Sequence, residues 1–441
     1  MNQLENILIE LIFVFLHFLL FLFNYRVMNK KIMQPAVLFS LLWFVIIALH
    51  FVFRFTLLNE LFPLHTGTFV IFFLGVLSFS LGSLLVTLIK EKKAPSESGQ
   101  ILADVTSKTS LSLALRVVLL GIILVGLPFY IHAAYKIFIA SNIENFFAGL
   151  RTELSYGDED IGITKYLVSL SFVVYSINLY SYLKERNKIN KSIFISCLLI
   201  TITYSIFTTG RTFFFMILAL YLGMNFLLNR FFSVKKVAGY IVFFIIIFSI
   251  LGIFIGKGGD SSDSIKDNIY PASQNTSIYL VSSVNALDWE LHHNPQINFN
   301  GNNTLRFFEK LGEGLNIIDH VNLSDIVQGF VFVPYPTNVY TFYSPYIKDF
   351  GRLYAWFMIG LFGCIHTILY NKAVAKKSLR YSIYYSFMLF PLLLSFFQDQ
   401  YMLLISSWIQ FIFYTEAILF VNALLISKTN VHGSEKNIIL R

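Results

Sequence analysis

The chain has 441 residues, of which 56% are hydrophobic and only 13% charged, and its mean hydropathy is +0.67. A water-soluble globule could not bury that much apolar surface, so the composition indicates an integral membrane protein. The formal charge of +8 does not indicate nucleic-acid binding, because the basic residues lie in short connections between apolar stretches rather than on one soluble face.

Eleven apolar stretches approach or exceed the roughly 20 residues with which a helix crosses a bilayer. They lie at about 7–23, 36–58, 67–89, 111–139, 163–183, 192–208, 212–229, 237–256, 351–371, 380–397 and 400–426. The ten-residue alternating pattern of a membrane barrel is absent, so the sequence predicts an all-α polytopic membrane protein with about 11 transmembrane helices. The first stretch has no basic flank and no cleavage site, and we expect a retained helix rather than a signal peptide.

Lysine and arginine are concentrated in every second connection, and these connections carry 21 of the 33 basic residues. Because such connections face the cytoplasm, this pattern places the N-terminus and the polar segment 257–350 outside and the C-terminus inside. The expected organisation is a transmembrane bundle over 1–256, a large external loop over 257–350, the last three spans over 351–426 and a cytoplasmic tail over 427–441.

The segment 142–155 predicts a short helix that lies in the membrane interface. Its apolar residues recur at helical spacing: Ile143, Phe146, Phe147, Leu150 and Leu154. Arg151 lies on another side, at the depth of the lipid head groups, where it could bind a lipid-linked diphosphate. Attraction to ordinary anionic lipid explains the same position. Asp158 and Asp160 follow at a spacing that could hold a divalent ion, but solvated acidic loops are more common.

A second place on the external side is the turn T-T-G-R-T at 208–212, between two short apolar stretches. A turn that leads into a helix offers backbone amides and the positive end of the helix dipole, and Arg211 adds a bidentate donor. These features predict an anion site. An arginine whose side chain extends from a helix end to the interface accounts for Arg211 equally well.

The external loop 257–350 contains 10 of the 25 acidic residues. It predicts two amphipathic helices that could cap the bundle, separated by an Asn-rich segment at 294–303. Their apolar stripes consist of Leu280, Val284, Leu287 and Leu291, and of Leu305, Phe308 and Leu311. Arg306 lies off the second stripe.

Three titratable residues of this loop, Asp288, Glu290 and His320, are candidate general bases, because carboxylates and imidazoles can accept a proton from a hydroxyl group near neutral pH. Adjacent His292 and His293 point in different directions on a helix, so we expect no metal site. The sequence contains no H-E-x-x-H, G-x-S-x-G, Walker or dinucleotide-binding motif, and we expect no cofactor.

The most specific pattern ends the loop, where residues 336–341 read P-T-N-V-Y-T and residues 346–351 read Y-x-x-D-F-G. This pattern resembles the signature of the Wzy-type O-antigen and capsule polymerases, which join oligosaccharide repeat units in bacteria. The T-T-G-R-T turn is similar to a turn that those proteins place between neighbouring spans. Two Arg-x10-Gly pairs, Arg151 with Gly162 and Arg352 with Gly363, match a further pattern of their outer loops.

The resemblance implies a GT-C-like glycosyltransferase of the bacterial inner membrane, with its active face in the periplasm and its large loop partly helical. It would transfer a growing glycan from undecaprenyl diphosphate to the non-reducing sugar of one lipid-linked repeat unit. Its expected partners are the lipid-linked donor and acceptor, membrane lipid and, as a candidate, a polysaccharide chain-length regulator.

The chemistry of that transfer suggests a role for each candidate residue. The leaving diphosphate needs fixed positive charge, for which Arg211, Arg151 and Arg306 are the candidates. The acceptor hydroxyl must lose a proton to Glu290, Asp288 or His320. Two tyrosines, Tyr335 and Tyr340, could stack on sugar faces, although tyrosine is also a common anchor at the membrane interface.

The sequence is compatible with other functions. An O-antigen ligase would use the same chemistry, but the 336–351 pattern argues against it. A flippase or exporter of lipid-linked oligosaccharides would usually show internal repeats and charges at the bilayer midplane, whereas the charges here gather on the outer side. A non-enzymatic partner in a polysaccharide assembly complex would have the same composition.

Overall fold

The computed structural model describes residues 3–56, 58, 60–92, 111–156, 161–229, 265–293, 297–318 and 328–439. The chain divides into two compact units. Unit 1 comprises 1–95, 237–372 and 388–405, and unit 2 comprises 96–236, 373–387 and 406–441. The expected span 237–256 and the candidate base His320 lie outside the described residues.

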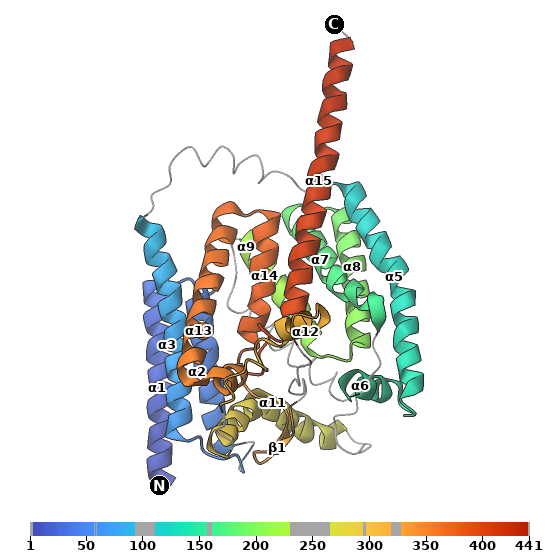
Figure 1. Ribbon diagram of the computed structural model, residues 1–441. Helices are drawn as coiled ribbons and strands as arrows, with labels where there is room; N and C mark the ends of the chain where they lie inside the picture. The colour runs from blue at the N-terminus through green and yellow to red at the C-terminus, as the bar shows by residue number, and fades with distance from the viewer. Residues whose placement is uncertain are drawn as a thin grey trace. The chain divides into compact units, whose positions relative to one another are not determined.

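Helices account for nearly all the regular structure (Figure 1). The elements of unit 1 are α1 (Gln3–Val27), α2 (Pro35–Phe55), α3 (Thr66–Lys92), α11 (Ile265–His293), α12 (Arg306–Gly314), β1 (Val331–Phe332), β2 (Pro336–Thr337) and most of α13 (Tyr343–Lys376). Those of unit 2 are α5 (Leu113–Ala140), α6 (Phe146–Tyr156), the 3₁₀ turn η1 (Gly162–Lys165), α7 (Tyr166–Lys184), α8 (Lys188–Phe207), α9 (Thr212–Leu228) and nearly all of α15 (Ile405–Ile439). Helix α14 (Leu379–Leu393) contributes to both units.

Eight described helices are long and apolar enough to cross a membrane: α1, α2, α3, α5, α7 with η1, α8, α13 and α15. Two shorter helices, α9 with 17 residues and α14 with 15, coincide with further expected spans. The prediction of an all-α polytopic membrane protein is therefore confirmed, and the chain is a multi-pass membrane protein. The total of about 11 spans stays a prediction.

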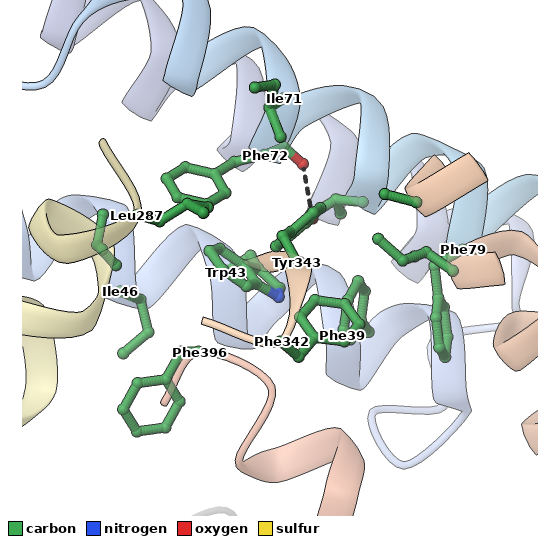
Figure 2. Packing of buried hydrophobic residues seen from close by; sticks show 14 of the residues in the cluster. Phe39, Trp43, Ile46, Ile71, Phe72, Phe79, Leu287, Phe342, Tyr343 and Phe396 are labelled. Carbon is green, nitrogen blue, oxygen red and sulfur yellow. Dashed lines mark hydrogen bonds between the residues drawn. The ribbon is translucent and has the colours of Figure 1, made fainter. Parts of the chain in front are cut away.

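The core of unit 1 is aromatic and joins the membrane helices to the segment expected to form the external loop (Figure 2). Trp43 of α2 packs edge to face against Tyr343 at a centroid distance of 5.3 Å, and its ring also lies near Phe342 and Phe72. The Tyr343 hydroxyl donates to the Phe72 carbonyl of α3 at 3.2 Å. Because aromatic side chains bury large apolar areas, this cluster fixes the end of the polar loop against α2 and α3.

Helix α11 runs across the ends of α2 and α3 and is hydrogen-bonded to several segments of unit 1 (Figure 1). Asn285 contacts the His50 ring of α2 at 2.9 Å and donates to the Phe62 carbonyl at 2.9 Å. Ser283 donates to the Phe396 carbonyl at 2.6 Å. The first expected stripe is buried, since Val284 and Leu287 are both 0% exposed. These contacts are compatible with the expectation that α11 caps the helix bundle.

The second expected stripe is different, because Phe308 and Leu311 of α12 are 48% and 49% exposed. Helix α12 is nevertheless the short helix that the sequence predicts. The only described strands, β1 and β2, follow it in the chain and pair antiparallel, with Val331 opposite Thr337. They bring the first residues of the P-T-N-V-Y-T pattern next to Val331.

Small residues bring α3 and α13 into close contact. A Cβ atom on Gly82 would lie 2.0 Å from the Gly360 carbonyl oxygen, and one on Gly363 would lie 2.2 Å from the Phe79 carbonyl oxygen. Such backbone approaches are the usual use of glycine between membrane helices. Packing therefore accounts for Gly363, the glycine of the second Arg-x10-Gly pair.

We predict that Gly82→Ala destabilises the protein by about 1 to 3 kcal/mol, because the added methyl group would force α3 and α13 apart. Gly67→Ala in the same helix is the matched control, since a Cβ atom there would meet nothing within 4 Å. Thermal unfolding in detergent measures both variants. Equal melting temperatures for the two variants would contradict this account of the contact.

Unit 2 is organised around α7, the most completely buried of the candidate spans. Helices α5, α8 and α9 all contact it. The Tyr204 hydroxyl of α8 donates to the Ile123 carbonyl of α5 at 2.9 Å, and the Arg116 guanidinium donates to Asn190 at 2.7 Å. These polar contacts between apolar helices hold α5 and α8 together, because a polar group left unpaired in hydrocarbon is costly.

Candidate functional site

A polar pocket lies in unit 1 where the expected external loop meets the segment between α14 and α15. Its volume is about 40 Å³, enough for a few water molecules or one polar substituent of a larger ligand. Its walls are Asn303, Arg306, Gln328, Asn338, Tyr340, Pro345, Gln398, Asp399 and Leu403. Two sequence-predicted residues, Arg306 and Tyr340, therefore meet at one pocket.

The Y-x-x-D-F-G pattern shapes one side of this pocket. Asp349 is 0% exposed and accepts hydrogen bonds from the backbone of Asn303 and Thr304 and from both of their side chains, at 2.6 to 3.2 Å. These bonds fix the residues that precede Arg306 at the start of α12. Gly351 has φ +84° and ψ 179°, which interrupts α13. Because that conformation is essentially restricted to glycine, the break requires Gly351.

Asp399 is buried in the pocket wall and was not among the sequence-predicted residues. Its carboxylate accepts from the backbone N–H groups of Tyr401, Met402 and Leu403 at 3.0 to 3.2 Å and from the Tyr346 hydroxyl at 3.0 Å. Burial raises the pKa of Asp399 to about 6, although these four donors oppose the shift. All of the roughly four acceptor positions of the carboxylate are thereby occupied, as expected for an anchor.

Glu290 lies close to the same pocket. Its carboxylate accepts from the Ser344 hydroxyl at 2.7 Å and pairs with Lys348 at 2.5 Å. The Lys348 ammonium also lies 5.1 Å from the centre of the Tyr340 ring. Burial, and then the Glu290 charge, raise the pKa of the Tyr340 hydroxyl to about 12. Lys348 therefore links Glu290 to Tyr340. The sequence predicted the last two as site residues but not the lysine.

Asp288 faces away from this group, toward the start of α3. It accepts from the His65 backbone N–H at 3.0 Å, from the Thr68 hydroxyl at 2.5 Å, and contacts the His65 ring nitrogen at 2.9 Å. These three donors occupy most of its acceptor positions. Asp288 therefore holds α11 to α3.

His65, Asp288 and His292 form a group whose potential metal-ligand atoms lie within 4.8 Å of one another. The two imidazole rings are stacked, with centroids 3.7 Å apart and planes at 21°. A metal ion lies about 2.0 to 2.1 Å from a nitrogen ligand, along the lone pair in the ring plane. Two nearly parallel planes do not meet at that distance, so these rotamers do not suit one ion. The absence of a metal stays a prediction.

Arg211 lies in unit 2, in the turn between α8 and α9. The turn contains Thr209 in the left-handed region, at φ 55°. The Gly210 N–H donates to the Thr208 hydroxyl at 3.3 Å, and the Phe213 and Phe214 N–H groups donate to carbonyls of the turn. The sequence predicted backbone N–H groups that are free to bind an anion. This prediction is wrong for Gly210, Phe213 and Phe214, whose N–H groups donate to other atoms of the turn. The half-buried guanidinium of Arg211 is the stronger candidate for holding an anion.

Arg151 lies in α6, also in unit 2, where the sequence predicts an amphipathic helix. The apolar side of α6 packs on α5: Leu150 is 0% exposed and clusters with Ala134 and Ile137. Arg151 is half-buried. Two other sequence-predicted features lie elsewhere: Tyr335 packs against Leu58 and Leu61 in unit 1, and Asp158 and Asp160 fall outside the described residues.

Comparison with known proteins finds two relatives that are named as O-antigen polymerases. The chain is 23% identical over 407 residues to a putative O-antigen polymerase of Escherichia coli (strain K12), covering 89% of this chain and 93% of that protein. It is 29% identical over 236 residues to an O-antigen polymerase of Shigella dysenteriae, covering 53% of this chain and 57% of that protein. No protein-family model matches the chain, and no solved structure matches it. The resemblance to Wzy-type polymerases is confirmed by these homologues.

Proposed function

We propose that this protein polymerises lipid-linked oligosaccharide repeat units into O-antigen or a related polysaccharide. The observation that carries the proposal is the similarity to a protein named putative O-antigen polymerase over 89% of the chain. The membrane helices, and the polar pocket that residues of the expected external loop line, are compatible with a glycosyltransferase that acts at the membrane surface.

The proposed reaction exchanges one bond to the anomeric carbon for another. The bond between that carbon and the undecaprenyl diphosphate oxygen breaks, and the electron pair leaves with the diphosphate. A glycosidic bond forms to the acceptor hydroxyl, whose proton passes to a base. Arg211, Arg151 and Arg306 are the candidates for stabilising the leaving diphosphate, because a guanidinium carries permanent charge and two aligned donors.

Glu290 is the best candidate for the base among the described carboxylates. Ser344 and Lys348 occupy two of its roughly four acceptor positions, so it retains capacity for a substrate hydroxyl. Asp288 and Asp399 accept three and four hydrogen bonds from fixed donors. His320 remains a candidate on sequence grounds. Tyr340 would contact the glycan at the pocket, with Arg306 on another wall.

The proposed setting is the bacterial inner membrane, with the pocket on the periplasmic side, the N-terminus outside and the C-terminus inside. The supporting observation is the alternation of basic connections along the sequence. Lipid-linked donor and acceptor would reach the site from the outer leaflet. A chain-length regulator remains a candidate partner.

Purified protein supplied with a synthetic undecaprenyl-diphosphate repeat unit tests the proposal directly. We expect a ladder of products that differ by one repeat, with one undecaprenyl diphosphate released for each new glycosidic bond. A deletion strain gives an independent test and should carry single repeat units on its lipid A core. A strain without surface repeats would indicate a flippase, and long chains retained on the carrier would indicate a ligase.

A further inference from the structure

We propose that an aromatic groove in unit 2 holds the isoprenoid chain of the carrier lipid, with its diphosphate at Arg151 and Arg211. This inference rests on the proposed function, because that function supplies the carrier lipid. It goes further by assigning the apolar part of the substrate to particular side chains.

The groove lies between α5, α6 and the end of α8. Its volume is about 650 Å³, which falls within the range of small-molecule sites. It is lined by Pro128, Ile131, His132, Tyr135, Phe146, Phe147 and Phe207. Only the imidazole of His132 and the hydroxyl of Tyr135 interrupt an otherwise apolar set of side chains.

The sequence builds this groove from three elements. The α5 residues lie at positions 128, 131, 132 and 135, a spacing that places them on one face of a helix. Helix α6 is fixed beside them, because Leu150 is fully buried against Ala134 and Ile137. The rings of Phe146 and Phe147 lie 5.9 and 6.3 Å from the ring of Phe207. The groove is therefore formed by packed elements rather than by a loose loop.

An arginine follows each of the two aromatic segments of the groove by four residues in the chain. Arg151 follows Phe147 by four residues in α6, so the two side chains lie about 40° apart around the helix, at the border between its apolar stripe and its polar side. Arg211 follows Phe207 by four residues, in the turn that begins where α8 ends. A long hydrocarbon with an anionic head fits this combination. Two guanidinium groups also suit two phosphates, which favours a polyprenyl diphosphate over a phospholipid with one.

A photoreactive polyprenyl diphosphate without sugar tests the assignment in detergent-solubilised full-length protein. We expect its chain to label residues 128–135 or 146–147, as mapped by mass spectrometry. Unlabelled polyprenyl diphosphate should displace the probe at concentrations where phosphatidylglycerol does not. Equal displacement by phosphatidylglycerol would show that the groove takes ordinary lipid chains and would overturn the proposal. Labelling confined to other segments would overturn it as well.

A pair of tryptophan variants adds a functional readout. Ile131→Trp should narrow the groove and weaken both labelling and chain formation about tenfold. Ile122→Trp is the matched control: it is 46% exposed on α5 and lies about 120° around the helix from Pro128. Equal effects of the two variants would contradict the proposal. The proposed function is judged separately, by whether the unmodified protein forms a ladder from the synthetic repeat unit.

Discussion

Replacing Glu290 by glutamine is expected to reduce polymerisation about 100-fold or more, the lower range of what a general base contributes. Glutamine has nearly the same shape and can still accept from Ser344, which bonds the native carboxylate at 2.7 Å. It cannot take a proton from the acceptor sugar. Product ladders from purified protein and a synthetic repeat unit provide the measurement, with protein levels matched.

The lysine partner of Glu290 requires its own control. Glu290→Gln leaves Lys348 without the carboxylate that lies 2.5 Å from its ammonium, and the unpaired charge alone could distort the pocket. The double variant Glu290→Gln with Lys348→Gln removes that imbalance. It should remain inactive if Glu290 is the base, and it should recover activity if only the charge balance matters. Recovery in the double variant, or normal ladders from the single one, would contradict the role of Glu290.

Asp399 offers a distinct pH signature. Its pKa of about 6 means that the carboxyl group is protonated below that pH, so a reaction that used it as a base would speed up as the pH rises through 6. Asp399→Asn would then remove that dependence together with the activity. We expect instead that Asp399→Asn mainly lowers stability, because three hydrogen bonds tie this carboxylate to its own segment and a fourth, from Tyr346, ties it to α13.

The helices could be predicted from the sequence because lipid imposes a simple rule. Apolar length alone located α1, α2, α3 and α5 to within a few residues. The division into units 1 and 2 follows no such rule, since α14 contributes residues to both. The two units are defined by contacts between segments that lie far apart in the chain. A local sequence pattern cannot predict such contacts.

The site was harder to predict than the fold for the same reason. Residue type and position identified Glu290, Tyr340 and Arg306, and the structure brings them to one region. Asp399 was missed because it follows an apolar stretch and looks like an interruption between two spans. The partner of Asp288 is His65, 223 residues earlier. Only the folded chain reveals such a pair.

The pattern that resembled the polymerases has a structural explanation as well. Asp349 binds the residues before α12, and Gly351 interrupts α13 where the loop passes into a membrane helix. The Y-x-x-D-F-G part of the pattern therefore fixes the wall that carries Arg306, whereas Tyr340 of the P-T-N-V-Y-T part lines the pocket itself.

Replacing Arg211 by lysine is expected to lower the rate of chain formation about 10- to 100-fold, because charge-assisted hydrogen bonds contribute about 1.5 to 3 kcal/mol each. Lysine keeps the positive charge, so simple attraction to the membrane surface is preserved. It loses the planar pair of donors that would bind two oxygens of the leaving diphosphate. The variant thus separates bidentate recognition from charge alone.

Kinetics with purified protein make this test sharper. If Arg211 stabilises the leaving group, Arg211→Lys should lower kcat, whereas a contact made equally in the ground state would raise KM and leave kcat unchanged. Arg186→Lys is the matched control in unit 2: the Arg186 guanidinium is exposed and donates to Asn229 at 2.9 Å, in a connection expected on the cytoplasmic side. Full-length ladders from Arg211→Lys at normal protein levels would exclude the guanidinium from the reaction, and the diphosphate would then have to be held at Arg306 or Arg151.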